Sequence, residues 1–284
     1  MAIFTNQATL TYNGNVTNSN ITTGEILEVV SATKNALIND YTPNDNVAYI
    51  ISIVNSGNTP INGLTVTDNL GAYTFNGNTL VPLTYVANSV AYYVNGTLQP
   101  APTVNNTSPL TFTGIDVPAN SNAIIIYEVQ TNQFAPLDVD GSITNQAVIT
   151  GGGIGNPITV TDTINTEDVA RLTITKSMSP TTVTENSQLT YTFVIQNSGN
   201  VPVVATDDVI MTDTFNPALQ GITVRFNDVV WTEGVNYSYT PTTGLFTTLN
   251  GQITVPAATY TQDPTTGNWI TTPGVSVLTI TGTV

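Results

Sequence analysis

The sequence predicts an all-β fold made of two tandem β-sandwich domains. Apolar residues alternate with polar ones over short segments, which Gly, Pro and Asn interrupt every roughly 8–12 residues. No segment shows the 3.6-residue apolar spacing of an amphipathic helix. The pattern occurs twice, with Val47 and Leu189 equivalent at an offset of 189 − 47 = 142 residues. The 284 residues therefore suit two domains of ordinary size, each able to bury its own core.

The predicted strands follow in the same order in both copies. Alternation over residues 47–53 ends at Asn55-Ser56-Gly57-Asn58, and alternation over 189–195 ends at Asn197-Ser198-Gly199-Asn200. Period two followed by Asn and Gly is typical of a half-buried strand and its turn. Three further pairs of segments match: 64–68 with 209–213, 114–118 with 251–256, and 123–129 with 275–284.

The repeat divides the chain into four parts. We expect an N-terminal donor strand with its linker over 1–29, a complete domain over 30–150, a linker over 151–170, and a second domain over 171–284 that lacks its final strand. The glycine-rich run at 151–157 lacks the strand–helix setting of a nucleotide-binding loop. It is therefore interpreted as flexible backbone at the start of the linker.

One four-residue motif occurs in two places. Thr144-Asn145-Gln146-Ala147 closes the first domain, whereas Thr5-Asn6-Gln7-Ala8 precedes any domain that it could close, and the second domain has no copy before Val284. The distance to the following lysine is similar in both, 176 − 145 = 31 and 34 − 6 = 28 residues. We therefore expect the N-terminal strand to complete the second domain of another copy, which would give a head-to-tail homopolymer.

The expected donor strand has one apolar face. Phe4, Ala8, Leu10 and Tyr12 share that face and would fill the open core of the acceptor. Two alternatives are that the segment folds back onto its own second domain, or that it is a disordered tail.

Strand alternation places one Lys, one Asp and one Asn in each interior. Lys34, Asp68 and Asn145 form the set of the first domain, and Lys176 and Asp213 form that of the second, with Asn6 supplied by the neighbouring molecule. Burial favours a neutral amine and a protonated carboxyl group. The amine is then able to attack the Asn carbonyl, with release of ammonia and formation of an amide cross-link. The alternative is a buried Lys–Asp ion pair with the Asn hydrogen-bonded nearby.

Composition excludes several classes of function. The formal charge of −15 argues against nucleic acid as a partner, and no apolar run is long enough for membrane insertion. The absence of Cys and His excludes disulfides, thiolate chemistry and the usual zinc sites, so we expect no cofactor or metal. No signal peptide is visible, yet the Thr- and Asn-rich composition suits an extracellular protein on a cell or spore surface.

A family resemblance supports this interpretation. Residues 172–176, the strand and turn at 191–199, Thr212-Asp213 and Thr144-Asn145-Gln146-Ala147 resemble the prokaryotic surface repeat known as domain of unknown function eleven. That family is Ig-like and similar to the isopeptide-bonded domains of Gram-positive pili and adhesins. The resemblance implies a surface or appendage role and agrees with the Lys, Asp and Asn sets.

The sequence therefore predicts a structural subunit of an extracellular fibre, pilus or spore appendage. The alternative is a monomeric surface adhesin or stalk module that binds a host or matrix ligand. An enzyme acting on other molecules is not expected, because the chain has no His, no Cys and no paired carboxylates outside its interior.

Overall fold

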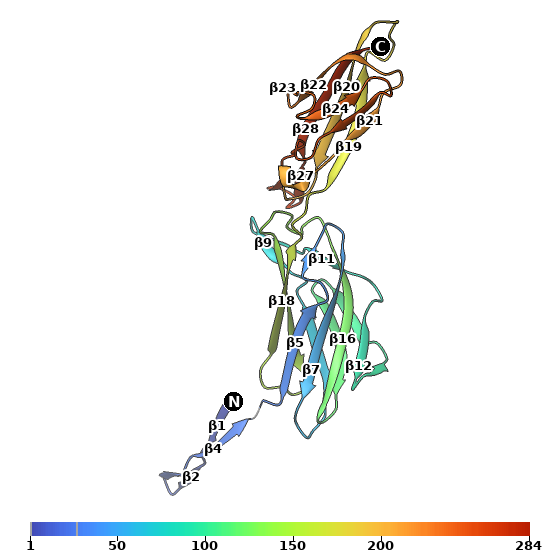
Figure 1. Cartoon of the computed structure of the whole chain (residues 1–284). Coiled ribbons are helices and arrows are strands. Elements are labelled where there is room, and N and C mark those ends of the chain that lie inside the picture. The colour runs from blue at the N-terminus through green and yellow to red at the C-terminus, as the bar shows by residue number, and fades with distance from the viewer. Residues whose placement is uncertain (1, 27) are drawn as a thin grey trace. The chain divides into compact units, whose positions relative to one another are not determined.

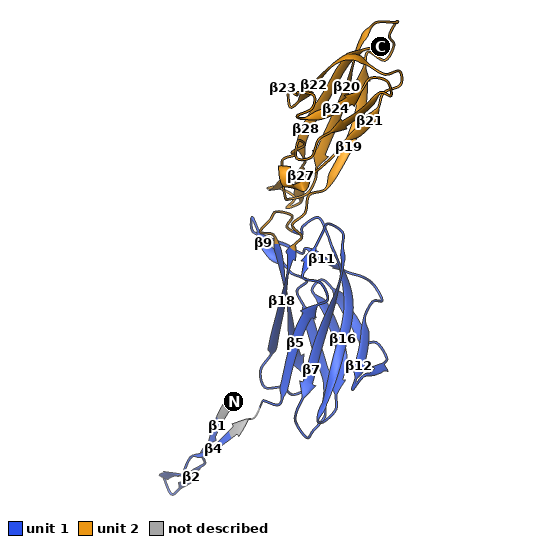
Figure 2. Cartoon of the chain, viewed as in Figure 1, with its two compact units in different colours: residues 1–135, 142–165 blue, residues 136–141, 166–284 orange. Residues whose placement is uncertain are grey.

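The computed structural model describes residues 2–26 and 28–284, with the side chains of residues 2, 3, 25 and 26 left aside. It divides the chain into two compact units, residues 1–135 with 142–165 and residues 136–141 with 166–284 (Figure 2). Each unit is a β-sandwich, so the predicted all-β, Ig-like fold is confirmed (Figure 1). No helix in the described part of the chain is long and apolar enough to cross a membrane.

Unit 1 packs two six-stranded sheets against each other. The first has the order β13 (Thr97–Gln99), β12 (Ala91–Val94), β16 (Ser121–Thr131), β7 (Asn46–Asn55) and β5 (Val30–Ala36), with β11 (Leu83–Tyr85) also paired to β16. The second has the order β14 (Thr103–Thr107), β15 (Leu110–Val117), β8 (Ile61–Asp68), β17 (Ser142–Gly151), β18 (Ile158–Thr166) and β6 (Asp40–Tyr41). A short hairpin, β9 (Tyr73–Phe75) with β10 (Asn78–Leu80), stands apart from both sheets.

The core of unit 1 lies between these sheets. The alternation that predicted β7 is visible in its burial, since Val47, Tyr49, Ile51 and Ile53 are fully buried. They pack with residues of the second sheet such as Phe112. Burial of every second residue is the arrangement that period-two patterning produces in a strand with one face on a core.

Among the described residues, unit 2 repeats five of the six strands of the first sheet of unit 1, with no counterpart of β11. The order is β19 (Leu172–Ser179), β20 (Gln188–Asn197), β28 (Gly274–Thr283), β22 (Gln220–Phe226) and β23 (Val229–Val230). These strands occupy the positions of β5, β7, β16, β12 and β13.

The second sheet of unit 2 has fewer described strands than its counterpart in unit 1, three against six. It contains β21 (Thr212–Thr214), β25 (Leu245–Thr248) and β24 (Tyr237–Thr240), in the positions of β8, β15 and β14. Among the described residues, unit 2 has no strand in the positions of β17, β18 and β6. A small hairpin, β26 (Thr259–Gln262) with β27 (Trp269–Thr272), and a 3-10 helix at Ala205–Asp207 complete the unit.

The N-terminal segment is a hairpin. β1 (Ala2–Asn6) pairs with β4 (Thr22–Ile26), and β2 (Thr9–Tyr12) pairs with β3 (Asn15–Asn18). The turn is Asn13-Gly14, and both residues have positive φ, 47° and 82°. All side chains from residue 4 to residue 23 are exposed. In the described residues these strands pair only with one another.

Two predicted linkers are wrong. Residues 15–26, expected to be part of the linker after the donor strand, form β3 and β4. Residues 158–166, expected to lie in the linker between the domains, form β18 of unit 1, which therefore extends beyond residue 150. The physical reason is the same in both cases. Each segment follows a turn rich in Gly and Asn and folds back as the second strand of a hairpin.

Candidate functional site: two Lys–Asp pairs and an open sheet edge

The first polar cluster lies in the core of unit 1. Lys34 of β5 donates a hydrogen bond to Asp68 Oδ2 of β8 at 2.5 Å, and both side chains are fully buried. The Tyr127 hydroxyl donates to the same oxygen, and the Leu70 backbone N–H donates to Asp68 Oδ1 at 2.7 Å. The Lys34 amine lies 4.7 Å from the centroid of the Tyr49 ring. A carboxylate and an aromatic face thus offset the cost of burying this amine.

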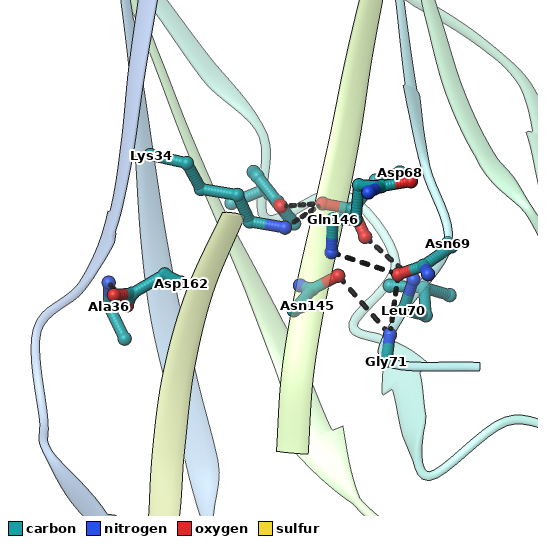
Figure 3. A network of polar contacts seen from close by, with 10 residues as sticks. Lys34, Ala36, Asp68, Asn69, Leu70, Gly71, Asn145, Gln146 and Asp162 are labelled. Atoms are coloured by element: carbon teal, nitrogen blue, oxygen red, sulfur yellow. Dashed lines mark hydrogen bonds and ion pairs between the residues drawn. The ribbon is translucent and has the colours of Figure 1, made fainter. Parts of the chain in front are cut away.

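Asn145 of β17 lies beside this pair (Figure 3). It is fully buried, and its Oδ1 accepts a hydrogen bond from the Gly71 backbone N–H at 3.2 Å. Its Nδ2 has no hydrogen-bond partner among the described residues. Asn69 fixes this arrangement, because its Oδ1 accepts hydrogen bonds from the N–H groups of both Gly71 and Gln146 at 2.9 Å.

Gly71 is at a position that only glycine fits. Its φ is 70°, in the left-handed region that side chains disfavour. A Cβ atom there would lie 2.4 Å from Ile143 Cγ2. The turn after β8 therefore depends on this glycine to bring its N–H to the Asn145 amide.

Burial changes the acid–base properties of the cluster. It lowers the pKa of the Lys34 amine to about 8, although Asp68 and Asp162 act in the opposite direction. Burial also raises the pKa of the Tyr49 and Tyr127 hydroxyls, and the charge of Asp68 adds to that rise. The lowered pKa raises the fraction of Lys34 amines that are uncharged near neutral pH. An uncharged amine is a nucleophile.

Unit 2 contains an equivalent pair. Lys176 of β19 donates a hydrogen bond to Asp213 Oδ2 of β21 at 2.5 Å. The amine lies 4.5 Å from the ring centroid of Tyr191 and 5.3 Å from those of Phe193 and Phe215. Like Lys34, Lys176 therefore points over the aromatic residues of its core.

The two pairs differ in their contact with solvent. The side chains of Lys34 and Asp68 are 0% exposed, whereas those of Lys176 and Asp213 are 40% and 18% exposed. Since the two pairs have the same bond length and equivalent strands, the difference reflects what covers them. β17 and β18 cover the pair in unit 1, and unit 2 has no described counterpart of either strand.

Among the described residues, one edge of unit 2 is unpaired. In unit 1, β8 pairs with β15 on one side and with β17 on the other, the latter through five residue pairs from Ala147↔Asp68 to Gly151↔Leu64. In unit 2, β21 pairs with β25, and no described strand occupies its other side. On that side the Thr214 N–H donates to Asp213 Oδ1 at 3.0 Å, whereas the equivalent Asn69 N–H of unit 1 donates to the Gln146 carbonyl of β17, so an added strand could pair with this edge once Thr214 exchanges its partner.

The predicted donor residues lie in the N-terminal hairpin. Phe4, Leu10 and Tyr12 are 54%, 65% and 72% exposed, and Ala8 is exposed as well. Asn6 lies in β1, is exposed, and pairs with Thr22 of β4. All the predicted donor residues and Asn6 are therefore exposed to solvent in the free chain.

The cluster of unit 1 has the groups required for amide cross-linking. Transfer of a proton from Lys34 to Asp68 along their hydrogen bond gives a neutral amine and a carboxylic acid. Attack of Nζ on Asn145 Cγ would form a C–N bond and place negative charge on Oδ1, to which the Gly71 N–H donates. Asp68 would then deliver its proton to Nδ2, so that the C–Nδ2 bond breaks and ammonia leaves, and the Asp68 carboxylate would take up the second proton of Nζ, which leaves a neutral amide.

Several residues of this cluster were not predicted from the sequence. Tyr49 and Tyr127 were identified only as members of alternating apolar strands, although Tyr127 hydrogen-bonds to Asp68. Asn69 and Gly71 follow β8. The Asn–x–Gly turn next to a candidate acid is the sequence signal by which they could have been found. Asp162 lies in a segment predicted to be a linker, so its proximity to Lys34 was not expected.

Comparison with known proteins adds a distant likeness in fold. No protein-family model matches this chain, and no similar sequence is found among curated proteins. The family resemblance inferred from the sequence thus remains a prediction.

Several solved pilin structures are similar to the chain. The pilus backbone RrgB of Streptococcus pneumoniae matches with a TM-score of 0.34 and 11% identity, over 86% of this chain and 55% of that chain. The major pilin subunit BcpA (D312A) of Bacillus cereus matches with a TM-score of 0.37 and 10% identity, over 96% of this chain and 73% of that chain. A C-terminal fragment of the major pilin GBS80 of Streptococcus agalactiae matches with a TM-score of 0.35 and 12% identity, over 87% and 91%. The present chain thus spans about half the length of the RrgB chain.

Proposed function

We propose that this protein is the structural subunit of an extracellular fibre, such as a pilus or a spore appendage, and that it polymerises head to tail. The N-terminal segment of one copy enters the open edge of unit 2 in the next copy. Contact between two different surfaces of the same chain does not close on itself, and its repetition generates a filament.

One observation carries this proposal. In unit 2, β21 has an unpaired edge among the described residues, and Lys176 beside it is partly exposed. In unit 1 the equivalent edge of β8 is paired with β17, and Lys34 is fully buried. The segment that fills the edge in unit 1 contains Thr144-Asn145-Gln146-Ala147. The same four residues recur at Thr5-Asn6-Gln7-Ala8, which span the end of β1 and the link to β2 and have exposed side chains.

The repeat assigns a place to each donor residue. Ala147 pairs with Asp68 in unit 1, so Ala8 would pair with Asp213, and Asn6 would lie where Asn145 lies. Phe4 and Leu10 would then occupy the positions of Ile143 and Ile149. Both of those isoleucines are buried in the core of unit 1, which supports the apolar fit of the donor.

The same placement supports two cross-links per subunit. Lys34 and Asn145, assisted by Asp68, would form an amide bond within unit 1. Lys176 and Asp213 would act in the same way on Asn6 of the neighbouring copy. Each bond forms once, with the protein as its own substrate, so the chain is not an enzyme acting on other molecules.

Negative-stain electron microscopy and sedimentation test the assembly. The full chain is expected to form fibres, and a variant that lacks residues 2–26 is expected to remain monomeric. The shortened variant keeps its acceptor edge but has no donor, so it should cap growing fibres and shorten them when it is mixed with the full chain. Fibres made by the shortened variant alone would refute strand donation. A full chain that stays monomeric at high concentration would instead favour a monomeric surface module.

A further inference from the structure

We infer that each subunit donates a closed two-stranded hairpin to its neighbour, with β1 and β2 beside β21 and with β3 and β4 covering β19. This inference rests on the proposed function. It differs from the addition of a single strand, in which residues 13–29 would serve only as a tether. The first observation is that residues 2–26 already form a hairpin, through ladders between β1 and β4 and between β2 and β3.

Unit 1 shows that the closing element is itself a hairpin. β17 pairs with β18 over eight residue pairs, from Ser142↔Asn165 to Ile149↔Ile158. In that ladder Asn145 is opposite Asp162, and in the N-terminal hairpin the equivalent Asn6 is opposite Thr22. In both hairpins the strand that carries the Asn comes first in the chain. In both, that Asn has a residue directly opposite it on the second strand.

The second strand of the unit 1 hairpin covers β5 and the segment after it. Asp162 Oδ2 accepts a hydrogen bond from the Ala36 backbone N–H at 2.6 Å, and Asn165 N–H donates to the Asn39 carbonyl at 2.8 Å. β18 therefore joins the two sheets along the side of the sandwich where Lys34 lies. In unit 2, β19 is the counterpart of β5, and it is exposed along almost its whole length. A single strand added to β21 would occupy only the place of β17 and would leave β19 uncovered.

Side-chain sizes on the two facing strands change in opposite directions between the units. In β5 the inward positions include Val30, Ala32 and Ala36, and their counterparts in β19 are the larger Leu172, Ile174 and Met178. In β18 the inward positions include Ile158, Asp162 and Ile164, and their register counterparts in the N-terminal hairpin are Thr17, Thr22 and Gly24. A bulkier acceptor strand thus faces a slimmer donor strand, which keeps the total volume of the packed layer similar.

Gly24 shows this exchange within the hairpin. In unit 1, Ile143 is opposite Ile164, whereas in the hairpin Phe4 is opposite Gly24. The Phe4 ring lies over the glycine, since a Cβ atom at residue 24 would be 2.3 Å from Phe4 Cζ. The closed hairpin therefore places a Phe opposite a Gly where the unit 1 hairpin places two isoleucines opposite each other. This pairing exists only while the two strands stay together.

A disulfide that locks the hairpin tests whether its strands separate. The chain has no cysteine, and the side chains of the cross-strand pair Thr9 and Asn18 are in contact, with Oγ1 to Oδ1 at 2.9 Å. Neither residue shares the apolar face of Leu10. A Thr9→Cys/Asn18→Cys variant, oxidised as a monomer, is expected to assemble at a rate within about twofold of its own reduced form. Assembly of the reduced form with none of the oxidised form would overturn the inference, because strand donation would then require the hairpin to open.

A second disulfide tests where the second strand lies. By analogy with the Asp162–Ala36 contact, a Thr22→Cys/Met178→Cys variant in an Asn6→Ala background should give a polymer ladder on non-reducing gels that reduction abolishes. The matched control is Thr23→Cys/Met178→Cys, whose first cysteine is on the opposite face of β4 and should give no ladder. Fibres in which Thr22→Cys and Met178→Cys do not cross-link, or cross-link no better than the control pair, would place the second strand elsewhere. If neither the natural chain nor the reduced lock assembles, strand donation itself has failed.

Discussion

Replacing Leu10 with alanine separates assembly from folding. Leu10 is 65% exposed in the free subunit, so its substitution should change the stability of the monomer by less than about 0.5 kcal/mol. In the fibre it would occupy the buried position of Ile149 in unit 1. Complete burial of a leucine contributes about 1.5–3 kcal/mol, and roughly two thirds of this gain is still to be made in the free subunit.

The expected effect on assembly follows from that fraction. The lost transfer free energy is about 1–2 kcal/mol, and the cavity left by alanine raises the total to about 2–3 kcal/mol. At a factor of ten for each 1.4 kcal/mol, the critical concentration should rise roughly 30- to 140-fold. The comparison is best made in an Asn6→Ala background, where no covalent bond with the neighbour is expected and donation is reversible.

Light scattering against protein concentration gives the critical concentration, and thermal unfolding of the monomer gives the stability. Thr11→Ala is the matched control, because Thr11 is also exposed but is on the opposite face of β2. It should change the critical concentration by less than about twofold. Equal effects of the two substitutions, or no effect of Leu10→Ala, would refute the argument that this apolar face enters a core.

Three further predictions concern the cross-links. Intact-mass measurement of the monomer should show a deficit of about 17 Da, one ammonia, and Asn145→Ala should abolish it; an unchanged mass in the natural chain would exclude the bond in unit 1. Fibres of a Lys176→Met variant should form but dissociate on boiling in detergent, and ladders that survive boiling would exclude this lysine as the nucleophile. In an Asn145→Ala variant Lys34 stays ionisable, with a folded-state pKa of about 8 against 10.5 when unfolded. Between these values the unfolded chain binds more protons, so stability should rise by about 1.5 kcal/mol from pH 8 to 9.5. Denaturant titrations at several pH values would detect this rise, and adding Lys34→Met should remove it.

Much of the fold followed from patterns that are local in the sequence. Strands β7 and β20 were predicted because each has an uninterrupted run of alternating apolar residues, and β16 because its residues 123–127 are continuously apolar. The tandem arrangement followed from the 142-residue offset between the strand and turn at 47–58 and those at 189–200, with three further matching pairs of segments. The N-terminal hairpin was missed although Asn13-Gly14 is a strong hairpin signal, because the short alternating runs beside it contain more Thr and Asn than apolar residues.

The candidate site was predicted in part for a similar reason. Face parity within a strand is a local property, and it identified the Lys, Asp and Asn residues as sharing the inward faces of their strands. Partners that come from turns and from distant strands were not predicted. The Gly71 N–H reaches Asn145 only because of a left-handed turn, and Tyr127 reaches Asp68 only because two sheets face each other.

The sequence by itself determined the strands, their repetition and the face on which each polar residue lies, because side-chain alternation is a property of one extended segment. Only the tertiary structure decided which strands pair and what covers them. It placed β18 beside the amide strand and left β21 with an unpaired edge. It also made the same Lys–Asp pair buried in one unit and accessible in the other. Solvent exposure depends on neighbours that are distant in the sequence, and no pattern along one strand reports whether those neighbours are present.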